Sequence, residues 1–348
     1  MAHYLITGHT GFKGAWLIFL LKAQGHNVSG LALDPLPGSI FDSADLESEL
    51  IHDFRADIRN RDETVKAIRH AQPDYVIHMA AQALVREGYR NPRYTYETNV
   101  FGTLNVLEAV DQTDSVRAQL IVTTDKVYLD QGLNRPYVET DPLGGKDPYS
   151  ASKAMADILS QEYLSRDGAK PGAIARAGNV IGAGDVSNER LIPDIVRAIE
   201  ADEPLVLRYP EAIRPWQHVL DCLGGYLSLL TGVDKSGLTG EFNFGPQPGS
   251  FASVQDVVRH IQSKRHLETQ QELPRGLGSM VEDTYLVLDS EKARNALCWN
   301  ERFGFKEAVE DASKALNGLS DSSIRSLINE TIYSWTRSPV GTHISMDS

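Results

Sequence analysis

Two groups of residues in this sequence could carry acid–base chemistry, and the first is a tyrosine–lysine pair. Tyr149 and Lys153 stand four positions apart, just after Pro148. The proline and the good helix formers that follow predict a helix from about residue 148, which places both side chains on one face, one turn apart. A neighbouring ammonium lowers the pKa of a phenol, so the pair could exchange a proton with a substrate hydroxyl near neutral pH. The same spacing is also typical of a solvated surface pair.

The second group is Thr123-Thr124-Asp125-Lys126, at the end of the apolar run that begins at Leu120. In an open α/β sheet, ligands bind at the carboxyl ends of the strands. A hydroxyl, a carboxylate and an amine at such an end form a possible set for proton transfer. The alternative is a polar strand exit followed by a helix cap.

A glycine-rich segment near the start of the chain predicts a dinucleotide site. The sequence GHTGFKG (8–14) follows the apolar run 3–7 and opens a helix over 14–24. Glycines in this context let backbone N–H groups approach a pyrophosphate at a helix N-terminus. Asp34 ends a strand over 27–33, where a carboxylate would bind the ribose 2′-hydroxyl and disfavour NADP. Asp57 and Ile58 could contact adenine, or Asp57 could cap a helix.

These residues need a scaffold, and the first half of the chain supplies its pattern. Short apolar runs at 4–7, 27–33, 75–78, 120–123 and 173–176 alternate with helix-length segments. This alternation predicts an α/β fold with a Rossmann-like, doubly wound parallel sheet over residues 1–180. Residues 181–335 are richer in proline, with helices expected at 191–201, 219–232, 253–263 and 290–297. We interpret them as a smaller α/β substrate region, partly interleaved with the first, and expect a flexible tail over 336–348.

Composition excludes several classes of protein. The chain has 34 Lys and Arg against 47 Asp and Glu, a net charge of −13, which disfavours nucleic-acid and anionic-membrane partners. No run of 18 apolar residues is present, and the seven-residue run 15–21 lacks the features of a signal peptide. The two cysteines form no disulfide framework or metal-binding pattern, so we expect no metal and a cytoplasmic setting.

Taken together, these motifs resemble the extended short-chain dehydrogenase/reductases that act on nucleotide sugars, and more narrowly the CDP-glucose 4,6-dehydratases. The Thr-Asp-Lys element is the most discriminating, because related dTDP-glucose dehydratases usually carry Thr-Asp-Glu there and epimerases usually carry a serine and no acid–base pair. The matching stretches lie at 8–14, 32–35, 80–86, 98–103, 123–126, 141–153, 175–182, 190–194, 213–219 and 288–293.

The resemblance implies a mechanism in which NAD acts as an internal relay. Tyr149, helped by Lys153 and Thr124, would take the proton of the C4 hydroxyl while hydride passes to NAD. Lys126 would assist removal of the C5 proton, and Asp125 would protonate the departing C6 hydroxyl. Hydride would then return to C6, giving a 4-keto-6-deoxy sugar nucleotide and a lyase with no net use of cofactor.

The resemblance also implies two sets of binding residues. The predicted NAD site comprises Gly8, Thr10, Gly11, Phe12, Gly14, Asp34, Asp57, Ile58, Ala80, Ala81, Asn99, Thr123, Tyr149 and Lys153. The predicted site for the nucleotide-diphosphate sugar comprises Gln82, Arg86, Asn179, Arg190, Leu191, Arg208, Arg214, His218 and Glu282. Arginine forks suit phosphate oxygens, although any one of these arginines could instead form a surface ion pair.

Two segments depart from the family pattern. The family commonly has Cys-Tyr-Glu-Asn where this chain has Val127-Tyr128-Leu129-Asp130, and His-Glu-Ala where it has Val281-Glu282-Asp283. The base and hexose of the substrate are therefore less strongly indicated than the reaction.

Other functions stay open at this point. Another nucleotide-sugar dehydratase and an epimerase are alternatives, and Asp125-Lys126 argues against the epimerase. A catalytically silent NAD-binding regulator would not need Thr124, Tyr149 and Lys153. The family further implies a homodimer through helices near 94–110 and 148–164, and a role in deoxysugar or surface-polysaccharide synthesis.

Overall fold

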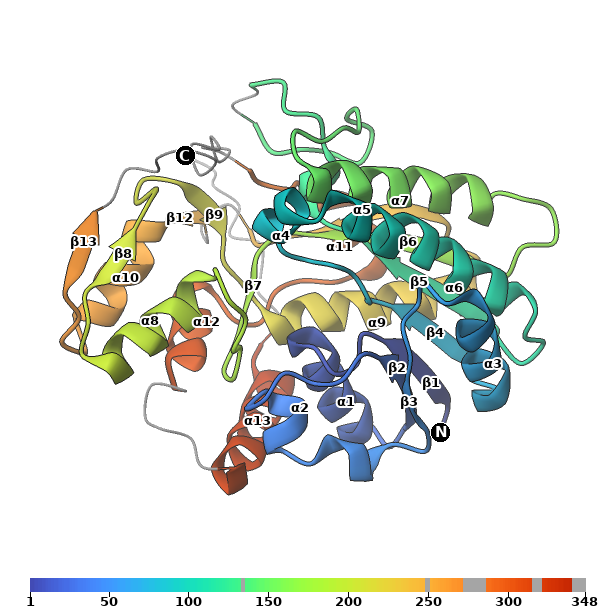
Figure 1. Cartoon of the computed structure of the whole chain (residues 1–348), viewed down its shortest axis with the longest axis horizontal. Coiled ribbons are helices and arrows are strands. Elements are labelled where there is room, and N and C mark those ends of the chain that lie inside the picture. The colour runs from blue at the N-terminus through green and yellow to red at the C-terminus, as the bar shows by residue number, and fades with distance from the viewer. Residues whose placement is uncertain (133–134, 248–250, 272–285, 315–320, 340–348) are drawn as a thin grey trace.

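A computed structural model describes residues 1–132, 135–247, 251–271, 286–314 and 321–339 (Figure 1). The strands are, in chain order, β1 (His3–Thr7), β2 (Asn27–Ala32), β3 (Asp53–Arg55), β4 (Tyr75–His78), β5 (Ala118–Val122), β6 (Gly172–Ala177), β7 (Val180–Ile181), β8 (Leu205–Leu207), β9 (Ile213–Pro215), β10 (Gln217–His218), β11 (Gly240–Phe244), β12 (Phe251–Ser253) and β13 (Thr269–Gln271).

The helices alternate with these strands in the first half and cluster in the second. They are α1 (Phe12–Ala23), α2 (Ile40–Ser43), α3 (Arg61–Ala71), α4 (Val85–Arg90), α5 (Pro92–Tyr96), α6 (Gly102–Asp111), α7 (Pro148–Leu164), α8 (Leu191–Ala201), α9 (Val219–Ser236), α10 (Val254–Gln262), α11 (Glu291–Leu297), α12 (Phe305–Ser313) and α13 (Asp321–Arg337). Short turns of other helix types are η1 (Leu46–Glu49), η2 (Glu97–Phe101) and η3 (Asp125–Val127).

The central sheet confirms the predicted fold class. Its strand order is β11-β6-β5-β4-β1-β2-β3, and every neighbouring pair is parallel. The winding direction reverses between β1 and β4, so the crevice for a ligand is expected beyond the carboxyl ends of these two strands. The glycine-rich segment follows β1, and the Thr-Asp-Lys element follows β5, next to β4.

Alternate residues of each strand face opposite helical layers. In β1, Leu5 packs into a core with α3 and α6, whereas Tyr4 and Ile6 pack into the larger core with α1 and α9. In Figure 1, α4 to α7 lie together above the sheet, and α1, α2 and α13 lie below it. Because both faces are covered, the strands read as continuous apolar runs in the sequence.

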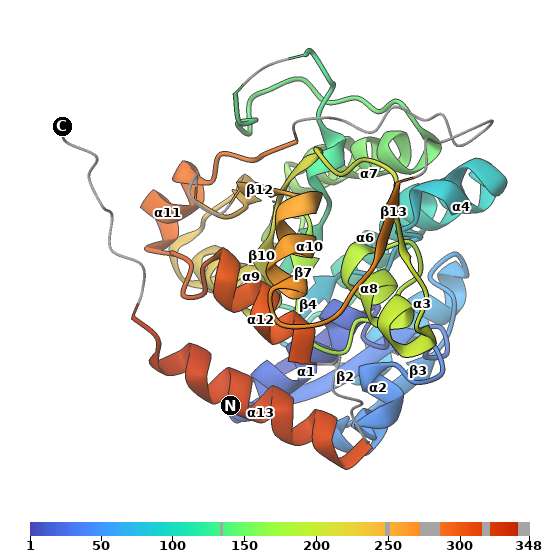
Figure 2. The ribbon, with the colours of Figure 1, turned by 90° about the vertical axis from the view of Figure 1, so that its left-hand side faces the viewer.

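The second half of the chain forms a separate cluster and also returns to the main sheet. Helices α8, α10 and α12 pack around the short strands β8, β9, β12 and β13, at the left of Figure 1. In contrast, β11 pairs with β6, and α9 packs against β5 and β6. Figure 2 shows α13 running beside α1 and α2. Its last residues, Thr336 and Arg337, fall in the predicted tail, of which 340–348 lie outside the described residues.

Helix α7 carries the tyrosine–lysine pair and has a well-formed start. The Asp147 carboxylate accepts hydrogen bonds from the backbone N–H of Ser150 at 3.0 Å and from its hydroxyl at 2.5 Å. Pro148 occupies the first turn, where the backbone N–H that proline lacks would have no partner within the helix. The cap therefore fixes where the helix begins, one residue before Tyr149.

Candidate active site

The turn between β1 and α1 brings backbone close to backbone. Gly8 has φ +74°, and a Cβ on Gly14 would stand 2.4 Å from the Gly8 carbonyl oxygen. A side chain at either position would force the turn apart. Gly11 precedes α1, and no side chain caps the first N–H groups of that helix. These N–H groups, at the positive end of the helix dipole, fit the pyrophosphate of a dinucleotide.

The two predicted acids of the adenosine end differ in their surroundings. The Thr10 hydroxyl donates to the Leu33 carbonyl at 3.1 Å and so ties the glycine turn to the residue before Asp34. The Asp34 side chain is exposed and has no hydrogen-bond partner among the described residues. Burial acts to raise the pKa of Asp57, but hydrogen bonds from Arg59 outweigh it and lower that pKa. Asp34 is therefore open to a ribose, whereas Asp57 is held by Arg59.

Two apolar residues of the predicted cofactor site pack inside the fold. Phe12 is half-buried, and its ring would be 3.3 Å from a Cβ on Gly182. Ile58 is buried, and its Cδ1 would be 2.6 Å from a Cβ on Gly102, so the start of α6 rests directly on it. Both side chains are thus held in place by glycines that leave room for them.

The loop after β4 closes over the glycine turn. A Cβ on Gly8 would be 2.8 Å from the backbone nitrogen of Ala80, and Ala81 follows, half-buried. Asn99 fastens this loop, because its amide exchanges hydrogen bonds of 2.8 and 3.0 Å with the backbone of Gln82 and donates to Ser152 at 2.9 Å. Asn99 therefore supports the predicted NAD site by shaping the loop.

The Thr-Asp-Lys element forms the short turn η3 at the end of β5. The Thr124 hydroxyl donates to Asp125 Oδ1 at 2.9 Å and accepts from the Lys126 backbone at 3.3 Å. Asp125 is 2% exposed, and its Oδ2 has no hydrogen-bond partner among the described residues. Burial raises the pKa of Asp125, against the opposing charges of Lys126 and Arg214 and the hydrogen bond from Thr124. The result is a buried carboxyl group that retains its proton more readily than usual.

Tyr149 lies beside this turn. Burial raises the pKa of its phenol to about 12, and the nearby charge of Asp125 also raises it. The hydrogen bond with Thr124 and the charge of Arg190 lower it. Thr124 therefore bridges the phenol and the buried carboxyl, and the structure brings Thr124, Asp125 and Tyr149 together as predicted from the sequence. The raised pKa of Tyr149 contradicts the lowered one expected for a phenol beside Lys153, because burial outweighs the nearby charges.

Lys153 is buried one turn further along α7. Its Nζ donates to the Val122 carbonyl at 2.8 Å, at the last residue of β5. Burial lowers its pKa to about 8; the charge of Asp157 raises this pKa, and that of Lys13 lowers it. Thr123 donates to the same Asp157 at 2.8 Å. The lysine is thus tied to the strand end that carries the other candidate catalytic groups.

Arginines approach this site from the second half of the chain. Arg190 precedes α8, which begins at Leu191, and its charge acts on the phenol of Tyr149. Arg214, on β9, is 6% exposed, and its charge acts on Asp125. Asn179 follows β6 at the carboxyl edge of the sheet, where its carbonyl accepts from Gln217 at 3.3 Å. Two cations therefore face the buried acid and the phenol.

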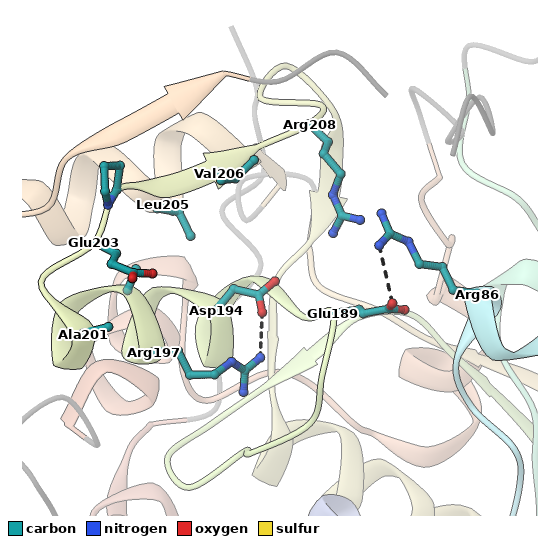
Figure 3. A pocket seen from close by; sticks show the side chains of 11 residues that line it. Arg86, Glu189, Asp194, Arg197, Ala201, Glu203, Leu205, Val206 and Arg208 are labelled. Atoms are coloured by element: carbon teal, nitrogen blue, oxygen red, sulfur yellow. Dashed lines mark hydrogen bonds and ion pairs between the residues drawn. The ribbon is translucent and has the colours of Figure 1, made fainter. Parts of the chain in front are cut away.

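A cavity of about 520 Å³ opens between α4, α8 and β8 (Figure 3). Figure 3 shows Arg86 and Arg208 reaching toward each other across its mouth, with Glu189 paired to Arg86 at 3.5 Å. Glu189 adopts φ +61°, a conformation that is rare for residues other than glycine. Arg208 forms no ion pair with a described residue. Arg197, paired with Asp194 at 2.6 Å, also lines the cavity, so two of its three guanidinium groups are already held by carboxylates.

Two residues predicted to bind the substrate are buried and bonded within the fold, and a third lies outside the described residues. The amide of Gln82 is buried and bonds to Thr95 and to the backbone of Leu84. His218 is fully buried: Nε2 pairs with Asp311 at 3.0 Å, and Nδ1 accepts from the Leu220 backbone. The imidazole of His218 therefore has no free nitrogen for a ligand, because it caps α9. Glu282 lies outside the described residues.

Sequence reasoning missed several polar residues around the site. Lys13, within the glycine-rich segment, donates to the Tyr226 hydroxyl at 3.2 Å. Asp157 and Glu189 contact residues that were predicted. Lys13 could have been found, since a cation beside a pyrophosphate turn is conspicuous. Tyr226 comes from α9, more than 200 positions away, and no local pattern connects it to the site.

Comparison with known proteins agrees with this geometry. Residues 5–312 match the family model described as GDP-mannose 4,6 dehydratase. A CDP-glucose 4,6-dehydratase of Salmonella typhimurium is 37% identical over 316 residues, 87% of each chain. A dTDP-glucose 4,6-dehydratase of Xanthomonas campestris is 29% identical over 329 residues, 89% of this chain and 91% of that one. A solved UDP-glucose-4-epimerase of Stenotrophomonas maltophila, with bound NAD, is 20% identical with a TM-score of 0.80 over 92% of this chain and 100% of that one, which shows the shared fold.

Two features are absent from the described residues. None of their helices is both long enough and apolar enough to span a bilayer. They contain no group of three or more His, Cys, Asp or Glu side chains arranged to hold a metal ion. With a family model over most of its length and a dehydratase relative at 37% identity, the chain belongs to the GDP-mannose 4,6 dehydratase family.

Proposed function

We propose that this chain is an NAD-dependent nucleotide-sugar 4,6-dehydratase that converts CDP-glucose to CDP-4-keto-6-deoxyglucose. The observation that carries the proposal is the buried carboxyl of Asp125, next to Lys126, with a raised pKa and one oxygen that has no hydrogen-bond partner among the described residues. Loss of water from a sugar needs an acid for the leaving hydroxyl, which simple hydride transfer does not. The 37% identity to the Salmonella typhimurium enzyme supports CDP-glucose as the substrate.

The cofactor fits the residues at the switch point of the sheet. The turn containing Gly8 and Gly14 leaves room only for backbone, and the uncapped start of α1 suits a pyrophosphate. The exposed carboxylate of Asp34 would hold the ribose hydroxyls and repel a 2′-phosphate. NAD in this position would accept a hydride from C4 and later return it to C6, so that it is regenerated in each turnover.

Different side chains of the protein would carry out the separate proton transfers of the reaction. Tyr149 would take the proton of the C4 hydroxyl in its deprotonated form, with Thr124 as its hydrogen-bond partner and Lys153 one turn further along α7. The C4 ketone that results acidifies the hydrogen on C5, and Lys126 would assist its removal. Asp125 would donate its proton to the C6 hydroxyl as water departs, a role that its raised pKa favours because burial stabilises the protonated carboxyl.

The diphosphate of the substrate would bind among the arginines. Arg190 and Arg214 lie close enough to act on Tyr149 and Asp125, and Arg86 and Arg208 line the adjacent cavity. Guanidinium forks match phosphate oxygens in pairs of hydrogen bonds. The cavity also carries the acids Glu189, Asp194 and Glu203, so an anionic ligand would compete with carboxylates for its arginines.

Mass spectrometry of the purified chain with NAD and a panel of nucleotide hexoses tests the proposal. The panel comprises CDP-glucose, dTDP-glucose, UDP-glucose, GDP-mannose and UDP-N-acetylglucosamine. We expect loss of one water from CDP-glucose and none from the others. Loss of water from a different donor would correct the substrate and keep the reaction. An isomer of unchanged mass would indicate an epimerase, and no change with NAD bound would indicate a regulator.

We also propose that the chain forms a homodimer through η2, α6 and α7. Phe101, Met155 and Ile158 are 59%, 48% and 53% exposed, and η2 packs against α7. Burial of such side chains favours association. Ile158→Glu should yield a monomer in light scattering, while Tyr333→Glu, at an equally exposed apolar residue of α13, should not. A monomeric unmodified chain would contradict the proposal.

A cytoplasmic setting and a place in deoxysugar synthesis complete the proposal. Both cysteines are unpaired: Cys222 is buried and Cys298 is exposed. Free thiols persist in reducing compartments. The 4-keto product of the proposed reaction is reactive, so a further enzyme that transforms the ketone must consume it.

A further inference from the structure

A buried ion pair lies behind the candidate active site. Asp157 on α7 and Arg176 on β6 are 0% and 1% exposed, and the guanidinium donates to both carboxylate oxygens, at 2.9 Å from Nε and 2.7 Å from Nη2. A buried pair of this kind contributes little net stability, because each charge loses its hydration. The role of the ion pair therefore lies in the groups that it contacts.

The carboxylate of Asp157 is saturated with donors. Besides the two bonds from Arg176, its Oδ2 accepts from the Thr123 hydroxyl and its Oδ1 from the Gln161 amide, both at 2.8 Å. Four donors leave no lone pair for a proton, so the group acts as an anion held in one orientation. No part of it is available to a substrate.

Two hydrogen bonds join α7 to the end of β5 at this point. Thr123 donates to Asp157, and one turn earlier Lys153 donates to the carbonyl of Val122. The next residues along the chain are Thr124 and Asp125. The pair thus fixes the strand end that presents the candidate acid and hydroxyl, relative to the helix that presents the phenol.

Arg176 is itself anchored from the opposite side. Its Nη1 donates to the Tyr128 hydroxyl and to the Glu139 carbonyl, both at 3.0 Å. The Tyr128 hydroxyl in turn donates to Asn243 Oδ1 at 2.6 Å. The segment that follows the Thr-Asp-Lys element is therefore linked through Arg176 to the same carboxylate.

Titratable groups face Lys153 from three elements. Asp157 lies on α7, Lys13 on α1 and His78 on β4. Burial and the charge of Lys153 lower the pKa of His78 to about 3, so this imidazole is neutral at ordinary pH. Asp157 is the anion that opposes burial and Lys13, which both lower the pKa of Lys153.

We propose that Asp157, oriented by Arg176, is a positioning residue that keeps Lys153 cationic and holds the β5 end in register with Tyr149. It acts through Lys153 and Thr123 and touches neither substrate nor cofactor. This inference rests on the proposed function, in which Lys153 assists Tyr149. A purely structural ion pair would affect folding without changing the charge of the lysine.

The test follows Lys153 directly by NMR, in full-length protein with isotope-labelled lysine and without substrate. Lys153→Met identifies the signal. In Asp157→Asn the pH midpoint of Lys153 should fall by about one unit. In Arg176→Met, where the anion loses its partner cation, the midpoint should move upward. Where either variant fails to fold, Asp157→Asn with Arg176→Met removes both charges and should still lower the midpoint, by less than Asp157→Asn alone.

Asp311→Asn is the matched control, because Asp311 is a buried acid on α12 paired with His218, and neither residue acts on the pKa of Lys153. It should leave the Lys153 midpoint unchanged. A midpoint that stays fixed in Asp157→Asn, or that moves equally in the control, overturns the inference. Since no turnover is measured, this result is independent of whether the dehydratase proposal holds.

A second measurement links the charge to the reaction. The basic limb of the pH profile for C4 oxidation, followed by the absorbance of reduced nicotinamide, should move toward lower pH in Asp157→Asn. Thr123→Val removes one hydrogen bond and no charge, and should lower kcat without moving the limb. Equal movement in both variants would contradict the assigned role, and activity on no nucleotide sugar would contradict the proposed function instead.

Discussion

The hydroxyl of Thr124 donates to one oxygen of the buried Asp125 carboxyl at 2.9 Å, and the other oxygen has no partner among the described residues. Unpartnered polar atoms at such depth are costly and call for a cause such as a catalytic role or a bound water. The free oxygen lies 2.9 Å from where a Cβ on Gly178 would stand, so that glycine leaves space beside it. Oδ2 is therefore the oxygen of Asp125 that is available to a leaving hydroxyl.

Asp125→Asn should separate the two halves of the reaction. The amide keeps the shape and can accept from Thr124, but it cannot donate a proton to a leaving hydroxyl. We expect elimination of water to slow by about 10²–10⁴-fold, while C4 oxidation continues and reduced nicotinamide accumulates on the enzyme. Stopped-flow absorbance measures the accumulation, with the exposed Asp167→Asn as control. Equal slowing of both steps would assign Asp125 to orientation of the substrate.

Asp34→Ala should weaken NAD binding and relax discrimination against NADP. The carboxylate is exposed beyond β2 with no described partner, so its removal leaves the fold intact. Loss of a hydrogen bond to a charged group corresponds to about 10–100-fold in affinity. Calorimetric titration with each cofactor gives the ratio, and Asp114→Ala is the exposed control. An unchanged preference would remove Asp34 from the ribose site.

The sequence predicts the sheet and the strand-end residues because both rest on local pattern. Helix α8 coincides with the expected 191–201, and continuous apolar runs mark the buried strands. His218 shows the limit: its match to a family block does not reveal that Asp311, 93 positions away, occupies its ring nitrogen. Likewise Asp157 is one helical turn from Lys153, yet its partner Arg176 comes from the next strand. Contacts of this kind depend on how separate elements pack, which periodicity does not encode.

Glu301→Gln should stabilise the protein at pH 8. Burial, together with the charge of Asp221, raises the pKa of Glu301 from 4.5 to about 8. Its Oε1 has no hydrogen-bond partner among the described residues. A raised pKa means that the folded state holds the proton more tightly. Its stabilising effect is present below pH 4.5 and is lost as the pH rises to 8.

The amide has no proton to lose, so the free energy of unfolding at pH 8 should rise by about 2–4 kcal/mol. Urea unfolding at pH 5 and pH 8 checks this, and the gain should shrink at pH 5. Glu211→Gln, at an exposed acid, should change neither value. A loss of stability at pH 8 would mean that the carboxylate has an ionic role in the fold.

Glu189→Gln should tighten the binding of nucleotide diphosphates. In the free protein the Glu189 carboxylate lies 3.5 Å from Arg86 and 3.9 Å from Arg90, at the mouth of the cavity that Arg208 also lines. A diphosphate must compete with this carboxylate for the guanidinium groups, and the two anions repel each other. The amide removes both effects and retains the size of the side chain. We expect Kd for CDP to fall about three- to tenfold, which corresponds to the modest strength of half-exposed ion pairs.

Glu203→Gln is the matched control, because it removes a charge from the same cavity without freeing an arginine. Equal tightening in both variants would reduce the effect to general charge, and weaker binding in Glu189→Gln would show that the carboxylate orients Arg86 for the ligand instead of competing with it.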